Sequence, residues 1–284
     1  MTMTSTTKKR LTLLGACFFA FLFIVSPSSP SAPASSAVSV STSAPAPEAE
    51  VPSRLTEDAL MVSITHEPPS DLLPLRRIDP NKPMIALTFD DGPSRIHTHT
   101  ILDTLAEHEV LATFFVVENA VRRNPHVLTR TTALGHEVLN HSATHTRFTE
   151  LSASQMQAEV TRTSQTLYEV LGYAPPSFFR FPYGAFNHAT LSAIGELGYL
   201  AIGWSIDPED WRDRDPDIVY VRVMDELRDG DIILLHDIHP TTAEAVKNIV
   251  PSLLAQGFQL VTISELIYYR DLSTEAGTII HHGR

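Results

Sequence analysis

The sequence predicts an α/β fold, built as one domain in the part of the chain that follows residue 80. Two observations lead to this fold class. Short apolar runs alternate with amphipathic stretches between residues 83 and 263, and such alternation is typical of parallel strands joined by helices. Seven apolar runs occur in this region, a number that favours either a barrel or a strongly wound sheet.

The apolar runs are short and rich in β-branched and aromatic residues, which is typical of strands. We place strands at MIALTF (84–89), ATFFVV (112–117), HEVLN (136–140), SFFRF (177–181), LAIGWSI (200–206), DIILLH (231–236) and QLVTI (259–263).

Helices are expected between the strands because apolar residues recur there at helical spacing. Leu167 and Leu171 are four residues apart, as are Ile249 and Leu253, and each pair would lie on one buried face. Glycines stand where helix C-caps are expected, at Gly172, Gly198 and Gly257. We place helices at 97–108, 154–171, 187–197, 216–228 and 241–255.

The N-terminal residues resemble an export signal. Lys8, Lys9 and Arg10 precede an apolar run over residues 11–25, which fits a signal-peptide core and is short for a membrane span of about 20 residues. We therefore assign residues 1–26 to a signal peptide or to a membrane anchor that is not cleaved. A lipoprotein cleavage site ending at Cys17 is disfavoured because the apolar run continues past this residue.

The rest of the chain divides into three parts. Residues 27–80 are expected to be a linker and irregular lead-in, because residues 27–53 are nearly all Pro, Ser or Ala and cannot build a core. The folded domain is expected over residues 81–270. Residues 271–284 are expected to be a C-terminal tail, with His281 and His282 disordered.

Composition excludes several classes of function. The chain has 284 residues, 43% of them hydrophobic, which is enough for a sizeable core. The net charge of −12 argues against nucleic acid as a partner, because phosphate binding needs a basic face. The single cysteine, Cys17, lies in the leader, so a cleaved chain has no disulfide, cysteine nucleophile or thiolate metal site.

Polar residues follow the expected strands at their C-terminal ends, which is where α/β barrels build their sites. The run IALTFDDGPS (85–94) places Asp90 and Asp91 side by side at the end of the first strand. Two like charges in one site repel. The pair is therefore either a solvated turn, which Asp, Gly and Pro all suit, or a pair used by a cation or in catalysis.

A histidine pair follows the third strand. His141 and His145 are four residues apart, so both would lie on one face if that turn is helical. Two imidazoles at this spacing can share one divalent cation, and two surface histidines are the alternative. With a carboxylate from Asp90 or Asp91, the set becomes two His and one Asp with room for water, which is typical of a catalytic metal site.

Five motifs occur in an order that resembles the polysaccharide deacetylases of the NodB-homology type, carbohydrate esterase family 4. They are TFDDGP (88–93), HSATH (141–145), RFPYG (180–184), DPEDW (207–211) and LLH (234–236). The similarity covers residues 83–268. Any one motif could arise by chance, but five in order are highly specific. The resemblance implies a distorted (β/α)7-type barrel with a single catalytic domain.

The resemblance also implies a role for each of the acidic and metal-binding residues. Asp91, His141 and His145 would hold the metal, with zinc as the first choice and cobalt or another divalent ion as alternatives. Asp90 would be the general base. Arg180 would pair with Asp90 and keep it ionised.

The later motifs would supply the acid and the walls of the site. The resemblance makes His236 the general acid and Asp210 its partner, which raises the pKa of the imidazole because an opposite charge favours imidazolium. Trp211 would form an apolar wall. The backbone N–H of Tyr183 would face the developing oxyanion.

The reaction implied is removal of N-acetyl groups from a polysaccharide that contains N-acetylglucosamine, such as peptidoglycan or chitin, with release of acetate and a free amine. An esterase that removes O-acetyl groups from xylan or another polysaccharide is the alternative enzyme. A non-catalytic carbohydrate-binding scaffold would have lost a ligand or the base, and neither is lost here. The expected partner is an acetylated glycan, with membrane contact only through an uncleaved anchor. The expected location is periplasmic, secreted or envelope-associated.

Three other polar residues have simpler interpretations. His239 could belong to a second metal site, but we expect a loop residue. Asp207 is expected to shape its loop, and Asn140 is expected to cap the turn at His141.

Overall fold

The structure, a computed structural model, describes residues 78–225 and 227–284. The predicted signal or anchor, Cys17 and all but the last residues of the predicted linker lie outside this part of the chain. In the described ranges no helix combines the length and the apolar character needed to cross a membrane.

Eight strands of the described residues form one sheet. They are β1 (Met84–Asp90), β2 (Thr113–Val116), β3 (Glu137–Asn140), β4 (Phe178–Phe179), β5 (Leu200–Ile202), β6 (Ile232–His236), β7 (Gln259–Val261) and β8 (Ile279–Ile280). The strand order is β6-β1-β2-β3-β4-β5-β8, with β7 paired to β1 beside this path. All pairs between these strands are parallel.

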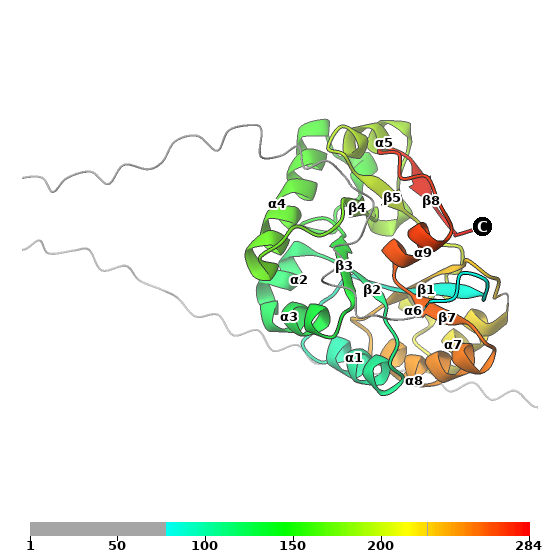
Figure 1. The fold of residues 1–284 in the computed structure, drawn as a ribbon. Helices are drawn as coiled ribbons and strands as arrows, with labels where there is room; N and C mark the ends of the chain where they lie inside the picture. Colours follow the sequence, from blue (N-terminus) through cyan, green and yellow to red (C-terminus); the bar gives the residue numbers. More distant parts are fainter. Residues whose placement is uncertain (1–77, 226) are drawn as a thin grey trace, which may run out of the picture. The chain divides into compact units, whose positions relative to one another are not determined.

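Helices pack around the outside of the curled sheet (Figure 1). They are α1 (His97–Glu107), α2 (Glu118–Arg123), α3 (Pro125–Ala133), α4 (Ala153–Leu171), α5 (His188–Gly195), α6 (Asp210–Asp213), α7 (Pro216–Asp225), α8 (Pro240–Ala255) and α9 (Ile263–Tyr269). Helix α8 packs between α1 and α7, and α4 contacts α2, α3 and α5.

The predicted α/β class and distorted barrel are confirmed, since the parallel sheet curls into a half-barrel with helices around it (Figure 1). Beyond the end of β5, Ile206 forms a parallel bridge with Ile233 of β6. This bridge brings the chain after β5 back to β6, the first strand of the order.

Three predictions need correction. The run predicted as a strand over 200–206 ends as a strand after Ile202, where the carbonyl oxygens of Ile202 and Gly203 accept from the Arg180 side chain. The tail is not disordered at His281 and His282. It adds the strand β8 beside β5, and His282 bridges Asp231. Helices α2, α3, α6 and α9 were not predicted.

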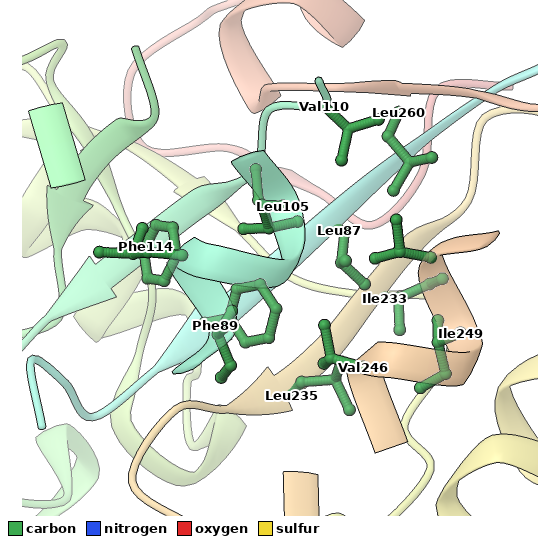
Figure 2. Packing of buried hydrophobic residues seen from close by; sticks show 14 of the residues in the cluster. Leu87, Phe89, Leu105, Val110, Phe114, Ile233, Leu235, Val246, Ile249 and Leu260 are labelled. Atoms are coloured by element: carbon green, nitrogen blue, oxygen red, sulfur yellow. The ribbon is translucent and has the colours of Figure 1, made fainter. Parts of the chain in front are cut away.

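The core consists of two layers because the residues of β1 alternate between the two faces of the sheet. Ile85, Leu87 and Phe89 pack outward against the helices. Figure 2 shows this outer layer, where side chains of β1 and β6 meet Val246 and Ile249 of α8. Met84 and Ala86 point to the inner face, together with Phe115 and Leu139.

The same alternation positions the first carboxylate of the site. Thr88 and Asp90 continue the inner-face series of β1, at the C-terminal end of the strand, and both are buried. A strand that is buried on both faces has a nearly continuous apolar sequence, which explains why polar residues are confined to this end of β1.

Candidate active site

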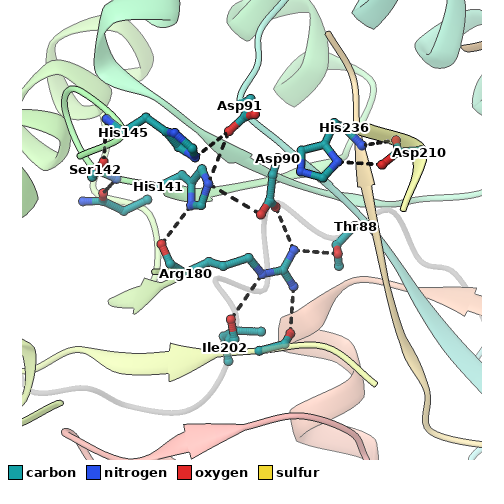
Figure 3. Close-up of polar contacts among 12 residues, drawn as sticks. Thr88, Asp90, Asp91, His141, Ser142, His145, Arg180, Ile202, Asp210 and His236 are labelled. Atoms are coloured by element: carbon teal, nitrogen blue, oxygen red, sulfur yellow. Dashed lines mark hydrogen bonds and ion pairs between the residues drawn. The ribbon is translucent and has the colours of Figure 1, made fainter. Parts of the chain in front are cut away.

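The candidate metal ligands meet at one point (Figure 3). Asp91 follows β1, while His141 and His145 lie in the loop after β3, and one ligand atom from each lies within 4.8 Å of the others. Asp91 Oδ1 is 3.1 Å from His145 Nε2 and 3.4 Å from His141 Nε2. This oxygen is buried and no donor reaches it with hydrogen-bond geometry. A carboxylate oxygen and two imidazole nitrogens converging in this way fit a divalent cation.

Asp91 and His141 shift each other's pKa within this cluster. Burial would raise the pKa of Asp91, but its interactions with His141 and His145 outweigh burial and lower the pKa well below the ordinary value. Burial would lower the pKa of His141, but Asp90 and Asp91 outweigh that effect and raise it. The pocket therefore favours positive charge next to the carboxylates.

The tautomer of His141 is determined by its partner. His141 Nδ1 lies 2.8 Å from the carbonyl oxygen of Arg180. Since a carbonyl can only accept, Nδ1 carries the proton and donates it. Nε2 is then the nitrogen that faces Asp91 and that, once deprotonated, can bind a cation. A second hydrogen bond of this kind is typical of metal-bound histidine.

The loop that carries the two histidines is not helical, which corrects the helical turn considered from their spacing. Ser142 and His145 have φ values of 71° and 60°. Asn140 Oδ1 accepts from the backbone N–H of Ser142 at 2.9 Å, as its predicted capping role requires. Ser142 Oγ in turn accepts from His145 N at 3.0 Å. The side chains converge because of this loop and not because of helical periodicity.

Asp90 is paired with a buried arginine. Arg180 is fully buried, and its Nη1 donates to Asp90 Oδ1 at 2.7 Å and to Thr88 Oγ1 at 2.8 Å. The other guanidinium nitrogens donate to the carbonyl oxygens of Ile202 and Gly203. Burial lowers the pKa of Arg180 while Asp90 raises it. A guanidinium with these partners stays charged, and its hydrogen bond fixes the position of the Asp90 side chain.

His236 is paired with a buried aspartate. His236 Nδ1 donates to Asp210 Oδ1 at 2.7 Å, and the backbone N–H of His236 donates to Asp210 Oδ2 at 2.8 Å. Thr242 also donates to Oδ2 of this fully buried aspartate. Burial opposes the charged imidazole, but the hydrogen bond and charge of Asp210 outweigh it and raise the pKa of His236 to about 9.

The two aromatic residues expected at the site are exposed. Tyr183 lies in the 3-10 turn Pro182–Gly184, and its ring centroid is 4.5 Å from that of His145. Trp211 follows the buried Asp210 in α6 and is 47% exposed. Both rings are therefore accessible to a ligand.

Three residues of the candidate site have strained backbone conformations. Asp91, His145 and Tyr183 have φ values of 76°, 60° and 61°, in the region that disfavours side chains with a Cβ. Such conformations persist where surrounding contacts hold them, and they cluster at functional sites. Sequence reasoning did not find this property, because none of these residues is a glycine.

The remaining polar residues agree with their simpler interpretations. Asp207 Oδ1 accepts from the backbone N–H of Glu209 at 2.9 Å, which shapes the turn before α6. Burial raises the pKa of this carboxyl, opposed by that hydrogen bond. His239 lies in the loop between β6 and α8, with its ring centroid 6.1 Å from that of His236.

Sequence reasoning missed several residues that support the site. Thr88 could have been found, because it lies two residues before Asp90 on the same face of a strand. Asp237 could not: a Cβ on Gly92 would lie 2.2 Å from its carboxylate oxygens, so the glycine after the aspartate pair is required by a contact distant in sequence. Burial raises the pKa of Asp237 to about 7.

A curled parallel sheet with a His-His-Asp cluster next to an arginine-bound carboxylate has the residue set of a metal-dependent hydrolase. Comparison with known proteins then assigns the family. The family model for polysaccharide deacetylase matches residues 77–202. The chain belongs to this family, the NodB-homology carbohydrate esterases of family 4.

Three relatives show the range of the family. Peptidoglycan-N-acetylmuramic acid deacetylase PdaC of Bacillus subtilis is 41% identical over 189 residues, which are 66% of this chain and 40% of the relative. The solved structure of PdaC matches with a TM-score of 0.65 at 40% identity, covering 68% of this chain and 94% of that chain.

Chitooligosaccharide deacetylase of Bradyrhizobium sp. is 33% identical, over 64% of this chain and 90% of the relative. A family 4 acetyl xylan esterase from Clostridium thermocellum, solved in complex with a cobalt ion, matches with a TM-score of 0.65 at 29% identity, covering 70% of this chain and 98% of that chain.

Proposed function

We propose that the protein is a metal-dependent N-deacetylase that removes acetyl groups from N-acetylglucosamine-containing polysaccharide of the peptidoglycan or chitin type. One observation carries this proposal. A metal-ligand cluster, an arginine-bound carboxylate and an aspartate-bound histidine lie together at the C-terminal edge of a single parallel sheet. Metal-assisted hydrolysis of an amide uses a cation, a base and an acid in one place.

Asp91, His141 and His145 would hold the metal, for which zinc is the first choice. When bound, the metal supplies a Lewis acid for the acetyl carbonyl and lowers the pKa of water. Asp90 is the general base: its carboxylate is buried, paired with Arg180 at 2.7 Å, and next to His141 at 3.6 Å. It takes the proton as the water oxygen bonds to the acetyl carbon. The backbone N–H of Tyr183 is assigned to the oxyanion.

His236 is the general acid. Its Nδ1 is committed to Asp210, so Nε2 is the nitrogen that can donate. The C–N bond breaks easily only if the amine leaves with a proton, and a pKa raised to about 9 keeps this imidazole protonated at neutral pH. The products are acetate and a free amine, and Trp211 forms an apolar wall beside the acid.

A glycan substrate of this kind lies outside the cytoplasm. The basic and apolar leader at residues 8–25 supports export of the chain, with the catalytic domain in the periplasm, envelope or medium. A net charge of −12 also supports a partner other than nucleic acid.

An O-acetyl esterase acting on xylan or a similar polysaccharide is the second candidate. The similarity to a family 4 acetyl xylan esterase supports it. Metal and base would serve both reactions, but an alkoxide leaves more readily than an amine. The hydrogen-bonded His236–Asp210 pair supports the reaction that depends more on an acid, which is amide hydrolysis.

The test is acetate release from N-acetylglucosamine oligomers, from peptidoglycan and from acetylated xylan. Each reaction is run with the purified chain, after treatment with a chelator, and after addition of Zn²⁺ or Co²⁺. We expect release from at least one N-acetylated glycan, loss with chelator and recovery with metal. Release from xylan alone supports the esterase. Full activity in metal-stripped protein would falsify the metal mechanism.

A further inference from the structure

The loop between the two histidine ligands depends on side chains for its backbone hydrogen bonds. His141 is the last residue of this segment whose N–H is bound by a strand, at the carbonyl of Val116. The following N–H groups, from Ser142 to His145, donate to side-chain oxygens. Side chains therefore hold the loop in shape: Asn140 and Ser142 from the segment itself, and Glu159 from outside it.

One carboxylate satisfies half of these donors. Glu159 of α4 is 9% exposed, and its Oε2 accepts from Ala143 N at 2.9 Å and from Thr144 N at 2.8 Å. Its Oε1 accepts from Thr144 Oγ1 at 2.9 Å. All three contacts go to the two residues just before His145. Hydrogen bonds to an ionised acceptor are the stronger kind.

The opposite side of the loop is held by a helix. The first N–H groups of α2, at Glu118 and Asn119, donate to the carbonyl oxygens of Ser142 and Ala143. The loop is thus held from two sides. Its carbonyl oxygens face the N-terminus of α2, and its N–H groups face the Glu159 side chain. Two of its residues, Ser142 and His145, have positive φ, and these contacts hold them there.

We propose that Glu159 is a positioning residue for the metal site. It holds the 141–145 loop in the conformation that brings His141 and His145 to Asp91. This inference rests on the proposed metal-dependent function. Glu159 touches neither imidazole, so its loss changes the placement of the ligands and not their chemistry. Residues that orient metal ligands typically contribute roughly 10–100-fold to metal affinity.

The test compares Glu159→Gln with Glu137→Gln in the full chain. Glutamine keeps the size of Glu159 but removes its charge and leaves a single acceptor oxygen, so the loop amides lose their hydrogen bonds to a carboxylate. Glu137 is the control, since it is a half-buried carboxyl that accepts from backbone N–H groups, at Ile263 and Ser264 of α9, and lies at the start of β3, the end of the strand opposite to the histidine loop. The measurements are Zn²⁺ affinity against a chromogenic chelator, the visible spectrum of the Co²⁺ form, and Tm without metal.

We expect Glu159→Gln to weaken Zn²⁺ binding roughly 10–100-fold and to alter the Co²⁺ spectrum, while saturating metal restores most of the turnover. Glu137→Gln should lower Tm but leave the metal affinity as in wild type. Thr144→Val, which removes one donor to Glu159 at an exposed position, should weaken metal binding in the same direction by a smaller factor. It serves as the test if Glu159→Gln does not fold.

Unchanged affinity in Glu159→Gln and Thr144→Val, or equal losses in the Glu137 control, would overturn the proposal. These results are distinct from failure of the proposed function. If the wild-type chain binds Zn²⁺ but releases no acetate, the function is wrong and the affinity comparison still decides the role of Glu159.

Discussion

Asp90 and His236 are paired positions on adjacent parallel strands, at the last residues of β1 and β6. Both face the inner side of the sheet, so the candidate base and the candidate acid are set next to each other by strand register. Figure 3 shows Asp90 between the metal ligands and His236. A one-residue slip of either strand would turn one of them to the helix layer. Strand register therefore places the candidate base and the candidate acid side by side.

Variants of the two adjacent aspartates should differ in metal content and in turnover. Asp90→Asn removes the proton acceptor but leaves Asp91 and both histidines in place, so kcat should fall by roughly 10²–10⁴-fold while the chain still binds one metal ion. Asp91→Ala removes a ligand and should lose metal. Metal content by elemental analysis and turnover are measured on the same samples. If Asp90→Asn is purified without metal and Asp91→Ala keeps metal and rate, the assigned roles are reversed.

The His236–Asp210 pair should make stability depend on pH in metal-free protein. The folded pKa of His236 is raised from 6.5 to about 9, so this contribution is fully present below the unfolded pKa and is lost as pH rises through the folded one. One pKa unit corresponds to about 1.4 kcal/mol, so the loss is on the order of 3 kcal/mol. Urea unfolding with chelator, from about pH 6 to about pH 10, measures it.

Asp210→Asn is the matched variant for this titration. It keeps the shape of the partner and removes the charge, so the stability loss between these pH values should become smaller. The alkaline limb of the pH–rate profile of the metal-loaded enzyme should also move to lower pH. An identical profile in wild type and variant would show that Asp210 does not set the protonation of His236.

The strands and helices that could be predicted from the sequence are those with a long buried apolar face. β1 and β6 are buried almost throughout, so their apolar runs are unambiguous, and the parallel topology then puts the residues after them at one edge. The long helices α4 and α8 were predicted for the same reason, since each has a periodic apolar face.

The sequence could not predict features that arise from contacts distant along the chain. β8 has only two residues, both half-buried, and gains its place from pairing with β5. The histidine loop takes its shape from Asn140, Ser142 and Glu159, and the spacing of the histidines gave no sign of this. The predicted ligand set, whose candidate ligand atoms the structure brings together, was therefore combined with the wrong local structure, a helical turn.

Removal of the leader should not harm the enzyme. A variant that lacks residues 1–53 should be soluble and keep its acetate release, because a Pro, Ser and Ala-rich segment contributes no core. The measurement is kcat/KM and Tm for this variant beside the full chain. A variant that folds but is inactive would assign a role in the reaction to residues 1–53.

The C-terminal tail should be coupled to Arg180 through Gly203. The backbone N–H of Gly203 donates to Ile280 O at 2.7 Å, while its carbonyl accepts from Arg180 Nη2 at 3.0 Å. A Cβ at position 203 would lie 2.2 Å from Nδ1 of His281. Gly203→Ala should therefore destabilise the chain by about 1–3 kcal/mol, as overpacking does, and disturb the arginine that holds Asp90, lowering kcat as well as Tm.

His281→Ala provides the control, because it removes the ring that a methyl group at position 203 would meet. The single His281→Ala variant should change Tm and kcat little. The double variant Gly203→Ala with His281→Ala should be more stable than Gly203→Ala alone, which gives a favourable coupling of about 1 kcal/mol or more in the cycle. Unfolding in urea and kcat are measured for all four proteins. Purely additive effects would mean that His281 does not pack on Gly203 and that the tail has no connection to the site.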